Sequence, residues 1–240
     1  MSTPRLNEFG QPIGDPVPDW KAPSRPSRTP LEGPYARLEP LDLAAHTADL
    51  FAASALDRDG RNWTYLFSDP PQTLAAYETW ARGVAASDDP FFYAIRDRAT
   101  GRLVGVASYL RIDPKAGSIE VGHINFSPLA QRTRVSTDAM HLMMANAFRL
   151  GYRRYEWKCD ALNAPSRTAA LRLGFTFEGI FRQALVYKGR NRDTAWFSIT
   201  DAEFPAIDRA FGTWLAASNF DAEGRQRARL SDLIARERSA

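Results

Sequence analysis

Cysteine and histidine are scarce in this chain of 240 residues, which contains one cysteine, Cys159, and three histidines. A single thiol cannot form an internal disulfide, so a disulfide-stapled secreted scaffold is excluded. It also cannot build a cysteine-based zinc site, and we expect no bound metal.

Long hydrophobic runs are absent as well, since no stretch approaches the ~18–20 apolar residues that span a bilayer. The first twenty residues carry Asp15, Asp19 and several prolines where a secretory signal needs an apolar segment. We therefore expect a cytoplasmic protein with no membrane partner. Charge of one sign is in small excess only, because 31 basic and 28 acidic residues give a net charge of +3. This bias is too weak to predict nucleic-acid binding.

Composition is otherwise that of an ordinary globular protein, with 44% hydrophobic and 25% charged residues. Nine of the sixteen prolines fall within residues 1–40, and residues 1–34 show neither helical nor strand periodicity. This segment is predicted to be a proline-rich N-terminal arm. Its apolar residues favour an arm laid over the fold rather than a free tail.

Regular patterns begin at residue 35 and predict one α+β domain of mixed α/β layers over residues 35–200, followed by a helical C-terminal extension over 201–240. Strands are expected at 35–40, 91–95, 103–110, 119–126, 154–160, 175–187 and 194–199. Helices are expected at 43–56, 73–84, 136–150 and 163–173. The last two strands are predicted to form a hairpin across a turn at 188–193.

The segment from Ser127 to Thr137 connects a predicted strand directly to the strongest predicted helix. The first turn of a helix offers free backbone amides and a partial positive charge, which suit a phosphate. Arg132 and Arg134 add cationic donors beside those amides. Many such turns bind nothing, and Asn163 and Gly174 likewise need no function beyond capping the short helix between them.

Together these features resemble the GNAT superfamily of acyl-CoA-dependent N-acyltransferases, in particular its RimJ/RimL-like branch, which includes ribosomal-protein-alanine acetyltransferases. Gln131, Arg134 and Ser136 occupy key positions of the family's pyrophosphate loop, and Thr137-Asp138-Ala139 matches the helix start that follows it. Further likenesses are Glu120-Val-Gly-His123, the Asn163-x-x-Ser166 element and Leu173-Gly174-Phe175.

The resemblance implies a GNAT-like fold, with a central, mostly antiparallel sheet flanked by helices, and acetyl-CoA as co-substrate. It assigns cofactor binding to Asn125, Phe126, Gln131, Arg132, Thr133, Arg134, Val135, Ser136, Thr137, Asn163 and Ser166. Two positions depart from the family pattern. Arg134 replaces a loop glycine and either restricts the backbone or contacts a phosphate itself. Ala170 stands where many members place a tyrosine that acts as an acid toward the leaving thiolate.

The implied reaction is transfer of an acetyl group to a primary amine by direct attack in a ternary complex. The amine must be neutral to attack, so the site needs a proton acceptor. Candidates are Glu120, His123 and Glu156, with Tyr187 as a candidate acid in place of Ala170. Strand alternation puts Glu120 and His123 on opposite faces unless a bulge intervenes.

The acceptor is expected to be a small-molecule or peptide amine, including a protein N-terminus, and a homodimer stays open. Aromatic residues are candidates for the acceptor pocket as well as for core: Trp63, Tyr65, Phe67, Tyr77 and Trp80. Two rival functions are a non-catalytic acyl-CoA-binding sensor and, with less support, an RNA- or ribosome-associated module. The second draws on a basic cluster, which is otherwise a solvated turn or a rim for anionic groups: Arg182, Lys188, Arg190 and Arg192.

Overall fold

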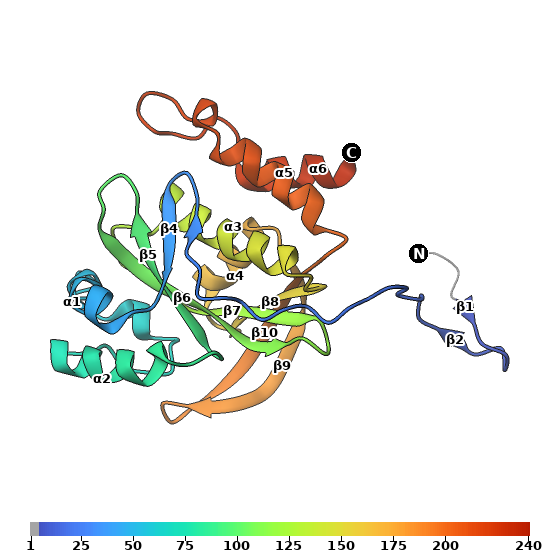
Figure 1. The fold of residues 1–240 in the computed structure, drawn as a ribbon, viewed down its shortest axis with the longest axis horizontal. Coiled ribbons are helices and arrows are strands. Elements are labelled where there is room, and N and C mark those ends of the chain that lie inside the picture. The colour runs from blue at the N-terminus through green and yellow to red at the C-terminus, as the bar shows by residue number, and fades with distance from the viewer. Residues whose placement is uncertain (1–4) are drawn as a thin grey trace.

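The computed structural model describes residues 5–240 and centres on one eight-stranded sheet with the strand order β3-β4-β5-β6-β7-β8-β10-β9 (Figure 1). Its strands are β3 (Leu31–Glu32), β4 (Ala36–Pro40), β5 (Phe91–Asp97), β6 (Leu103–Asp113), β7 (Ser118–Phe126), β8 (Arg154–Asp160), β9 (Thr176–Tyr187) and β10 (Arg190–Thr200). All neighbouring strands are antiparallel except β7 and β8, which run parallel. The predicted α+β class with a mostly antiparallel sheet is confirmed.

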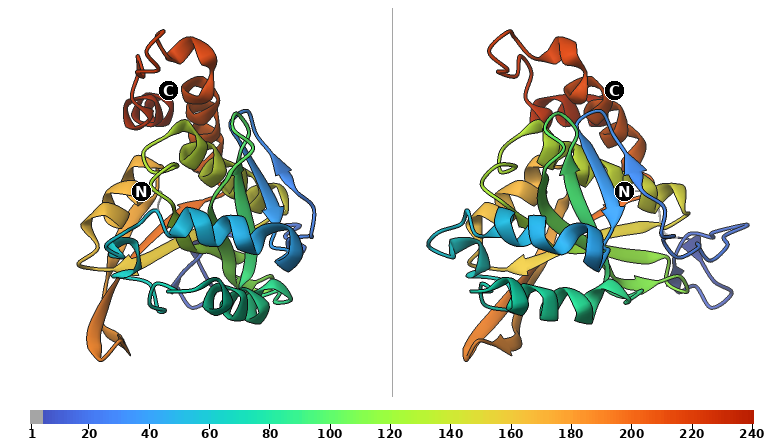
Figure 2. Two further views of the ribbon diagram at one scale, coloured as in Figure 1. Left: turned by 90° about the vertical axis from the view of Figure 1, so that its left-hand side faces the viewer. Right: turned by 60° about the vertical axis from the view of Figure 1, so that its left-hand side comes forward.

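Helices cover both faces of this sheet. They are α1 (Leu43–Ser54), α2 (Leu74–Ala85), α3 (Arg134–Arg149), α4 (Ala164–Arg172), α5 (Phe204–Leu215) and α6 (Leu230–Ser239), with 3-10 turns at Arg61–Trp63 and Ala217–Asn219. The helices α1 and α2 lie against β5 and β6 on one face, and Figure 2 shows them in front of the strands. The helices α3 and α4 lie on the other face, where the larger apolar core forms.

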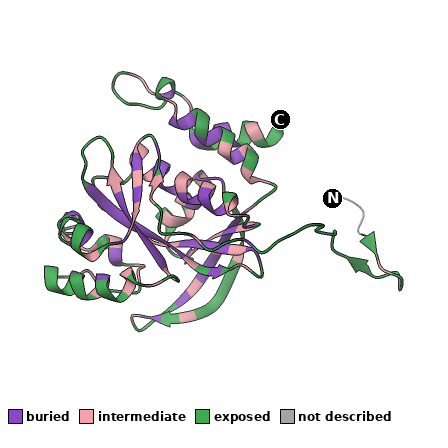
Figure 3. Cartoon of the chain, in the orientation of Figure 1, coloured by how far each residue is buried: buried purple, intermediate pink, exposed green. Residues whose placement is uncertain are grey.

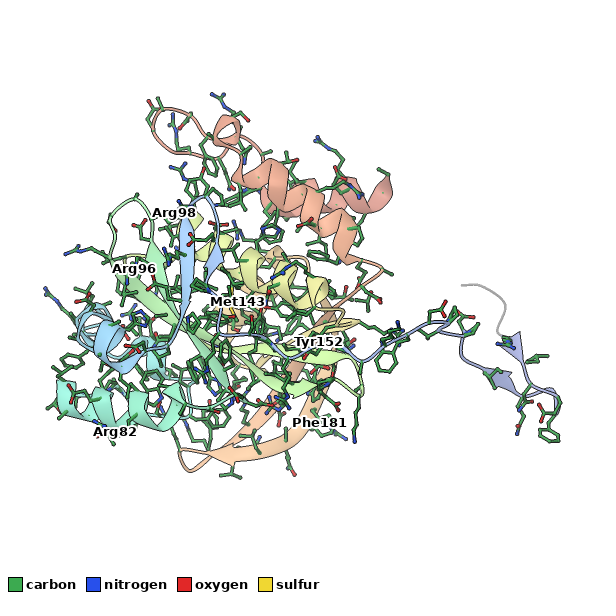
Figure 4. The ribbon with its side chains drawn as sticks, in the orientation of Figure 1. Arg82, Arg96, Arg98, Met143, Tyr152 and Phe181 are labelled. Carbon is green, nitrogen blue, oxygen red and sulfur yellow. The ribbon has the colours of Figure 1, made fainter. Side chains whose placement is uncertain are left out.

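The methionine-striped helix predicted at 136–150 is α3, which begins two residues earlier and ends one residue sooner. Met140, Met143 and Met144 are buried between α3 and the sheet, as their i, i+3, i+4 spacing predicts (Figure 4 labels Met143). The strand β8 coincides with its predicted bounds. Its alternating Tyr155 and Trp157 point into this same core.

The predicted turn at 188–193 is wrong, because the hairpin closes over only Lys188 and Gly189. Both residues have positive φ, 48° and 68°, which is the backbone twist that two-residue hairpin turns require. The strand β10 therefore begins at Arg190, which pairs with Tyr187, and Arg192 pairs with Leu185. Two arginines expected in a solvated turn thus belong to a strand.

The N-terminal arm has two parts. A small hairpin of β1 (Arg5–Leu6) and β2 (Pro12–Ile13) projects from the body with exposed side chains (Figures 1 and 3). The following segment lies on the fold, where Arg28 donates to the carbonyl of Ala85 at 3.0 Å and stacks over the ring of Phe91.

The C-terminal extension is helical only in part. Its helix α5 packs on α3, while α6 packs on α5 and α4, and residues 220–229 between them form a loop. Among residues 5–240, no helix has the length and apolarity needed to cross a bilayer.

Candidate functional site

The two parallel strands β7 and β8 pair only at their beginnings, from Ser118 with Arg154 to Val121 with Trp157. Beyond that point β7 follows β6 and β8 follows β10, so the two strands diverge. Divergence leaves the facing backbone groups of β7 without a strand partner, and such groups seek other hydrogen bonds. The fold thus opens a gap in the middle of its sheet, bordered by the end of β7.

A β-bulge lies at this end of β7. Gly122 pairs with Ser108 and Asn125 pairs with Val106, so two residues of β7, His123 and Ile124, face one residue of β6. The φ of His123 is 49°, in the left-handed region that non-glycine residues rarely adopt. The bulge turns the side chain of His123 to the α1/α2 side of the sheet, where Glu120 also points. The bulge therefore puts Glu120 and His123 on the same face of the sheet, whereas regular strand alternation would put them on opposite faces.

The imidazole of His123 is held by one neutral hydroxyl. Its Nδ1 lies 2.8 Å from Oγ of Ser108, and that hydroxyl donates to the carbonyl of Gly122 at 3.3 Å. While that hydroxyl donates to the carbonyl, Nδ1 donates to Ser108 and the lone pair of the ring lies on Nε2. Burial, and secondarily the charge of Arg111, lower the pKa of His123. The ring is therefore neutral at pH 7 and suited to accept a proton.

His123 borders a cavity of about 200 Å³. Its walls come from α1, α2, β5, β6, β7 and the segment 61–69, and include Leu50, Trp63, Leu66, Phe67, Tyr77, Trp80, Val84, Phe92, Val106, Asn125 and Ser127. Four of the five aromatic residues considered from the sequence are among them. Tyr65 is the exception, because its hydroxyl instead donates to the carbonyl of Leu162 at 3.3 Å. His123 is the one titratable imidazole, carboxyl, amine or guanidinium group in this lining, as far as the described residues go.

Both candidate carboxylates are clamped by cations outside this cavity. Glu120 accepts from Arg111 at 2.8 Å and lies 2.9 Å from Nζ of Lys158. Glu156 lies 2.6 Å from both Lys158 and Arg154. Burial would raise the pKa of Glu156, but the hydrogen bonds from Arg154 and Lys158 outweigh it and lower that pKa. The oxygens of both carboxylates are thus occupied by cationic partners.

Tyr187 lies at the end of β9, beside the last residue of β8. Its hydroxyl donates to Oδ2 of Asp160 at 2.8 Å, and its ring packs on Phe67 at 5.8 Å between centroids. Burial, followed by the adjacent carboxylate of Asp160, raises the pKa of Tyr187 to about 12. The phenol is therefore protonated throughout the physiological range. Ala170, by contrast, is fully buried in the core.

The loop before α3 presents the helix's first amides without a side-chain cap. The N-cap residue Thr133 donates its hydroxyl to the carbonyl of Ala130 at 2.7 Å instead of accepting from the helix. In α1, α2 and α4 the N-cap side chain does accept a helix amide. The amides of Arg134, Val135 and Ser136 thus begin α3 without intrahelical partners.

The left-handed residue of this loop is Arg132, with φ of 60°. Arg134, at the position of the family's loop glycine, is helical, so an arginine there meets no backbone restriction. Its guanidinium stacks between the rings of Tyr35 and Phe220, at 4.9 and 4.5 Å from their centroids. That stacking directs the side chain of Arg134 toward the C-terminal extension.

The remaining predicted binding residues have mixed surroundings. Gln131 donates to the carbonyl of Phe126 at 3.0 Å and to Asn62, so its side chain closes the loop. Thr137 is buried, and its hydroxyl donates to Thr133 within the helix. At α4, Oδ1 of Asn163 caps the amide of Ser166, and Oγ of Ser166 accepts from Nε1 of Trp157.

Three residues of the predicted basic cluster hold the segment 61–69 against the hairpin, whereas the fourth, Arg182, is exposed on β9. Lys188 pairs with Asp69 at 2.9 Å and donates to the carbonyl of Trp63. Arg190 donates to the carbonyl of Thr64 at 3.1 Å, and Arg192 stacks on the ring of Phe67. These cations therefore fix one wall of the cavity.

Sequence reasoning missed four residues of the site: Asn62, Ser108, Ser127 and Lys158. Lys158 belongs to the predicted strand at 154–160, but nothing in the local sequence indicates its partner Glu120 on β7. No group of three or more histidine, cysteine, aspartate or glutamate side chains within residues 5–240 is arranged to hold a metal ion.

Comparison with known proteins identifies the family. Residues 36–176 match the model of the acetyltransferase (GNAT) domain. A GCN5-related N-acetyltransferase from Brucella melitensis is 47% identical, with a TM-score of 0.90 over 91% of this chain and 100% of that chain. A probable acetyltransferase of the GNAT family from Chromobacterium violaceum is 38% identical, with a TM-score of 0.76 over 81% of this chain and 98% of that chain.

A coenzyme A complex of RimL, a ribosomal L7/L12 α-N-protein acetyltransferase, is 20% identical, with a TM-score of 0.61 over 72% of this chain and 99% of that chain, and it shares the fold. No curated protein sequence matches. The family uses acetyl-CoA, and the diverging strands and uncapped helix start described above fit such a co-substrate. The matched domain spans more than half of the sequence, and the chain belongs to the GNAT family of acyl-CoA-dependent N-acetyltransferases.

Proposed function

We propose that the protein transfers the acetyl group of acetyl-CoA to a primary amine by direct attack, with His123 as the proton acceptor. The observation that carries this proposal is the bulge that turns His123 into the cavity at the point where β7 and β8 diverge. A neutral imidazole with a free Nε2 is the one group of the described cavity lining that can take a proton near pH 7.

The donor supplies the acetyl group and a thiolate leaving group, and this chain supplies its binding surface. We assign its diphosphate to the first amides of α3, from Arg134 to Ser136, with Arg132 as the adjacent cation. We assign its pantetheine arm to the end of β7 at Asn125 and Phe126, beyond the last residue that pairs with β8, and to the side-chain amide of Asn163. The carbonyl of Phe126 contributes less, because it already accepts from Asn62 and Gln131.

The acceptor reaches the site as an ammonium ion, since primary amines have pKa values of about 8–10.4. The ammonium loses one proton before it attacks. His123 then takes the second proton from the nitrogen as the neutral amine attacks the thioester carbonyl and the thiolate of coenzyme A leaves, and Ser108 holds Nδ1 of the ring. In this scheme Glu120 and Glu156 hold Lys158 and the strand ends in place rather than accept the proton, because their oxygens are already paired.

Tyr187 is the proposed donor toward the leaving sulfur. A phenol with a pKa of about 12 is a weaker acid than a thiol, whose pKa is ~8.5, so it gives a hydrogen bond rather than a complete proton. To give that bond, its hydroxyl must turn away from Asp160. Its contribution is therefore expected to be smaller than that of His123.

The test is release of free thiol from acetyl-CoA by the purified chain, measured with a panel of primary amines. We expect release that requires both substrates. Silence with every acyl donor and amine, while acetyl-CoA still raises the melting temperature, would instead establish the non-catalytic sensor. That second candidate draws on Ala170 and on the stacking of Arg134 away from the loop.

A further inference from the structure

Among the residues that the structure describes, the walls of the cavity beside His123 include no aspartate, glutamate, lysine or arginine, and this restricts the amines that the cavity can hold. We infer that the acceptor is a small monoamine with an apolar, aromatic-sized body, of the arylalkylamine class, rather than a polyamine or a basic peptide. The inference rests on the proposed function, because it assigns this cavity to the acceptor.

Among the described residues that line the cavity, none is an aspartate, glutamate, lysine or arginine. A second ammonium group on the ligand would lose its hydration there without gaining a carboxylate, which is a heavy desolvation penalty. A monoamine avoids that penalty, because its one nitrogen sits at His123. The same uncharged surroundings lower the amine's pKa and so favour the neutral nucleophile.

The size and the walls of the cavity suit a small aromatic body. About 200 Å³ is below the ~300–1,000 Å³ of sites for drug-sized ligands, so the cavity suits a single ring or a branched chain. The ring of Trp80 meets Tyr77 and Phe92 edge-on at 5.0 and 5.5 Å, and Phe92 lies 5.2 Å from the ring of His123. These rings provide aromatic surface that leads to the base.

Neutral polar groups of the lining also restrict the ligand. Asn125 and Ser127 line the cavity, and the buried Oγ of Ser127 has no hydrogen-bond partner within residues 5–240. Buried hydroxyls are normally paired. A neutral polar atom on the ligand would satisfy this one, whereas a cation would need an acceptor of full negative charge.

Charged residues nearby are turned away from the cavity. The amine of Lys188 is bound to Asp69 and to the carbonyl of Trp63, and the guanidinium of Arg190 to the carbonyl of Thr64. They fix the wall that Trp63 and Phe67 form without adding charge to it.

The experiment compares kcat/KM for 2-phenylethylamine, spermidine and a lysine-rich peptide with a free N-terminus, at fixed acetyl-CoA. We expect 2-phenylethylamine to be preferred by at least about 100-fold, because the other two bring unpaired charge. Quenching of tryptophan fluorescence by 2-phenylethylamine gives a second readout that needs no turnover, since Trp63 and Trp80 line the cavity.

A matched pair of variants at Ser68, an exposed residue of the cavity rim, sharpens the test. Ser68→Asp adds one carboxylate, and we expect it to reduce the preference over spermidine about tenfold. Ser68→Asn has a similar size and no charge, and we expect it to leave the preference unchanged.

Each other outcome is decisive. Equal or better use of spermidine or the peptide would overturn the inference and leave the proposed function standing. Preference for a six-carbon acyl donor over acetyl-CoA would assign the cavity to the acyl chain and overturn it too. If Ser68→Asp and Ser68→Asn change the preference for 2-phenylethylamine over spermidine equally, the acceptor does not bind in this cavity. Absence of thiol release with all amines, with acetyl-CoA binding retained, would overturn the proposed function itself.

Discussion

One face of the sheet has two contrasting halves. Over β5 and β6, α1 and α2 cover it and enclose a cavity with aromatic walls, in which His123 is the one imidazole, carboxyl, amine or guanidinium group of the described lining. Over β8 and β10, the same face carries a chain of ion pairs in which Lys158 joins Glu120 to Glu156. Figure 3 shows how exposed the outer strand β9 is beside the buried centre of the sheet. The strand β7 forms the border between the two halves. Its Glu120 belongs to the ion pairs, and its His123 lines the cavity.

The contrast separates two kinds of candidate base. A carboxylate whose oxygens are paired with cations gains little by taking a proton, because protonation breaks those pairs. An imidazole held by a hydroxyl in an uncharged cavity has no such pairs to lose. Chemistry is therefore expected on the aromatic side of β7 and structural support on the ionic side.

Replacement of the base should have the largest effect. We expect His123→Gln to lower kcat by about 10²–10⁴-fold, the usual contribution of a general base. Glu156→Gln, on the ionic side, should change kcat only a few-fold. Thiol-release kinetics check both, and thermal stabilisation by acetyl-CoA should survive in both. Equal losses of kcat in the two variants would contradict the assignment of the proton acceptor to the aromatic half.

Breaking the ion-pair chain should affect stability rather than chemistry. The side chains of Lys158 and Glu120 are 7% and 4% exposed, so Lys158→Met leaves two buried carboxylates short of a partner. We expect a loss of about 3 kcal/mol in the free energy of unfolding, measured by urea denaturation. Adding Glu120→Gln and Glu156→Gln to that variant should restore most of it. A loss below about 1 kcal/mol would show that Arg111 and Arg154 suffice.

Tyr187→Phe should have a moderate effect. It removes one hydrogen bond to the leaving sulfur, so we expect kcat to fall about tenfold with little change in KM for the amine. A matched control is Tyr65→Phe, whose hydroxyl contacts only a backbone carbonyl outside the cavity. Unchanged kcat in Tyr187→Phe would show that Tyr187 does not donate a hydrogen bond to the leaving sulfur.

The comparison also shows what local sequence patterns predict. Periodicity located α3 and β8, because the methionine stripe and the alternation of Tyr155 with Trp157 are written in consecutive residues. The hairpin turn was predicted too long, because the charged residues from Arg190 on resemble a solvated loop. Their strand conformation depends on pairing with β9, which lies earlier in the chain.

The site was predictable only where a motif is contiguous. The loop before α3 could be located in this way, whereas the partners of His123 could not. Ser108 and Arg111 come from β6, and their approach depends on strand register and on a bulge at a non-glycine residue. No rule of residue spacing forecasts that bulge, so both carboxylates and His123 stood as equal candidates in the sequence.

The smallest expected effect is a shift in the pH dependence. Burial and the charge of Arg111 lower the pKa of His123 below its usual 6.5, so the base becomes protonated and inactive only as pH falls through that lowered value. The amine must also lose a proton with a pKa of about 8–10.4. A plot of log kcat/KM against pH should therefore have a slope of about one below the amine pKa and about two below the pKa of His123.

Arg111→Gln removes a nearby positive charge and leaves Glu120 less neutralised, and both changes favour the imidazolium. We expect the break in slope to move to higher pH in that variant and to stay in place in Arg236→Gln, on α6. If the slope changes at the same pH in Arg111→Gln as in the unaltered protein, the group that titrates is not His123.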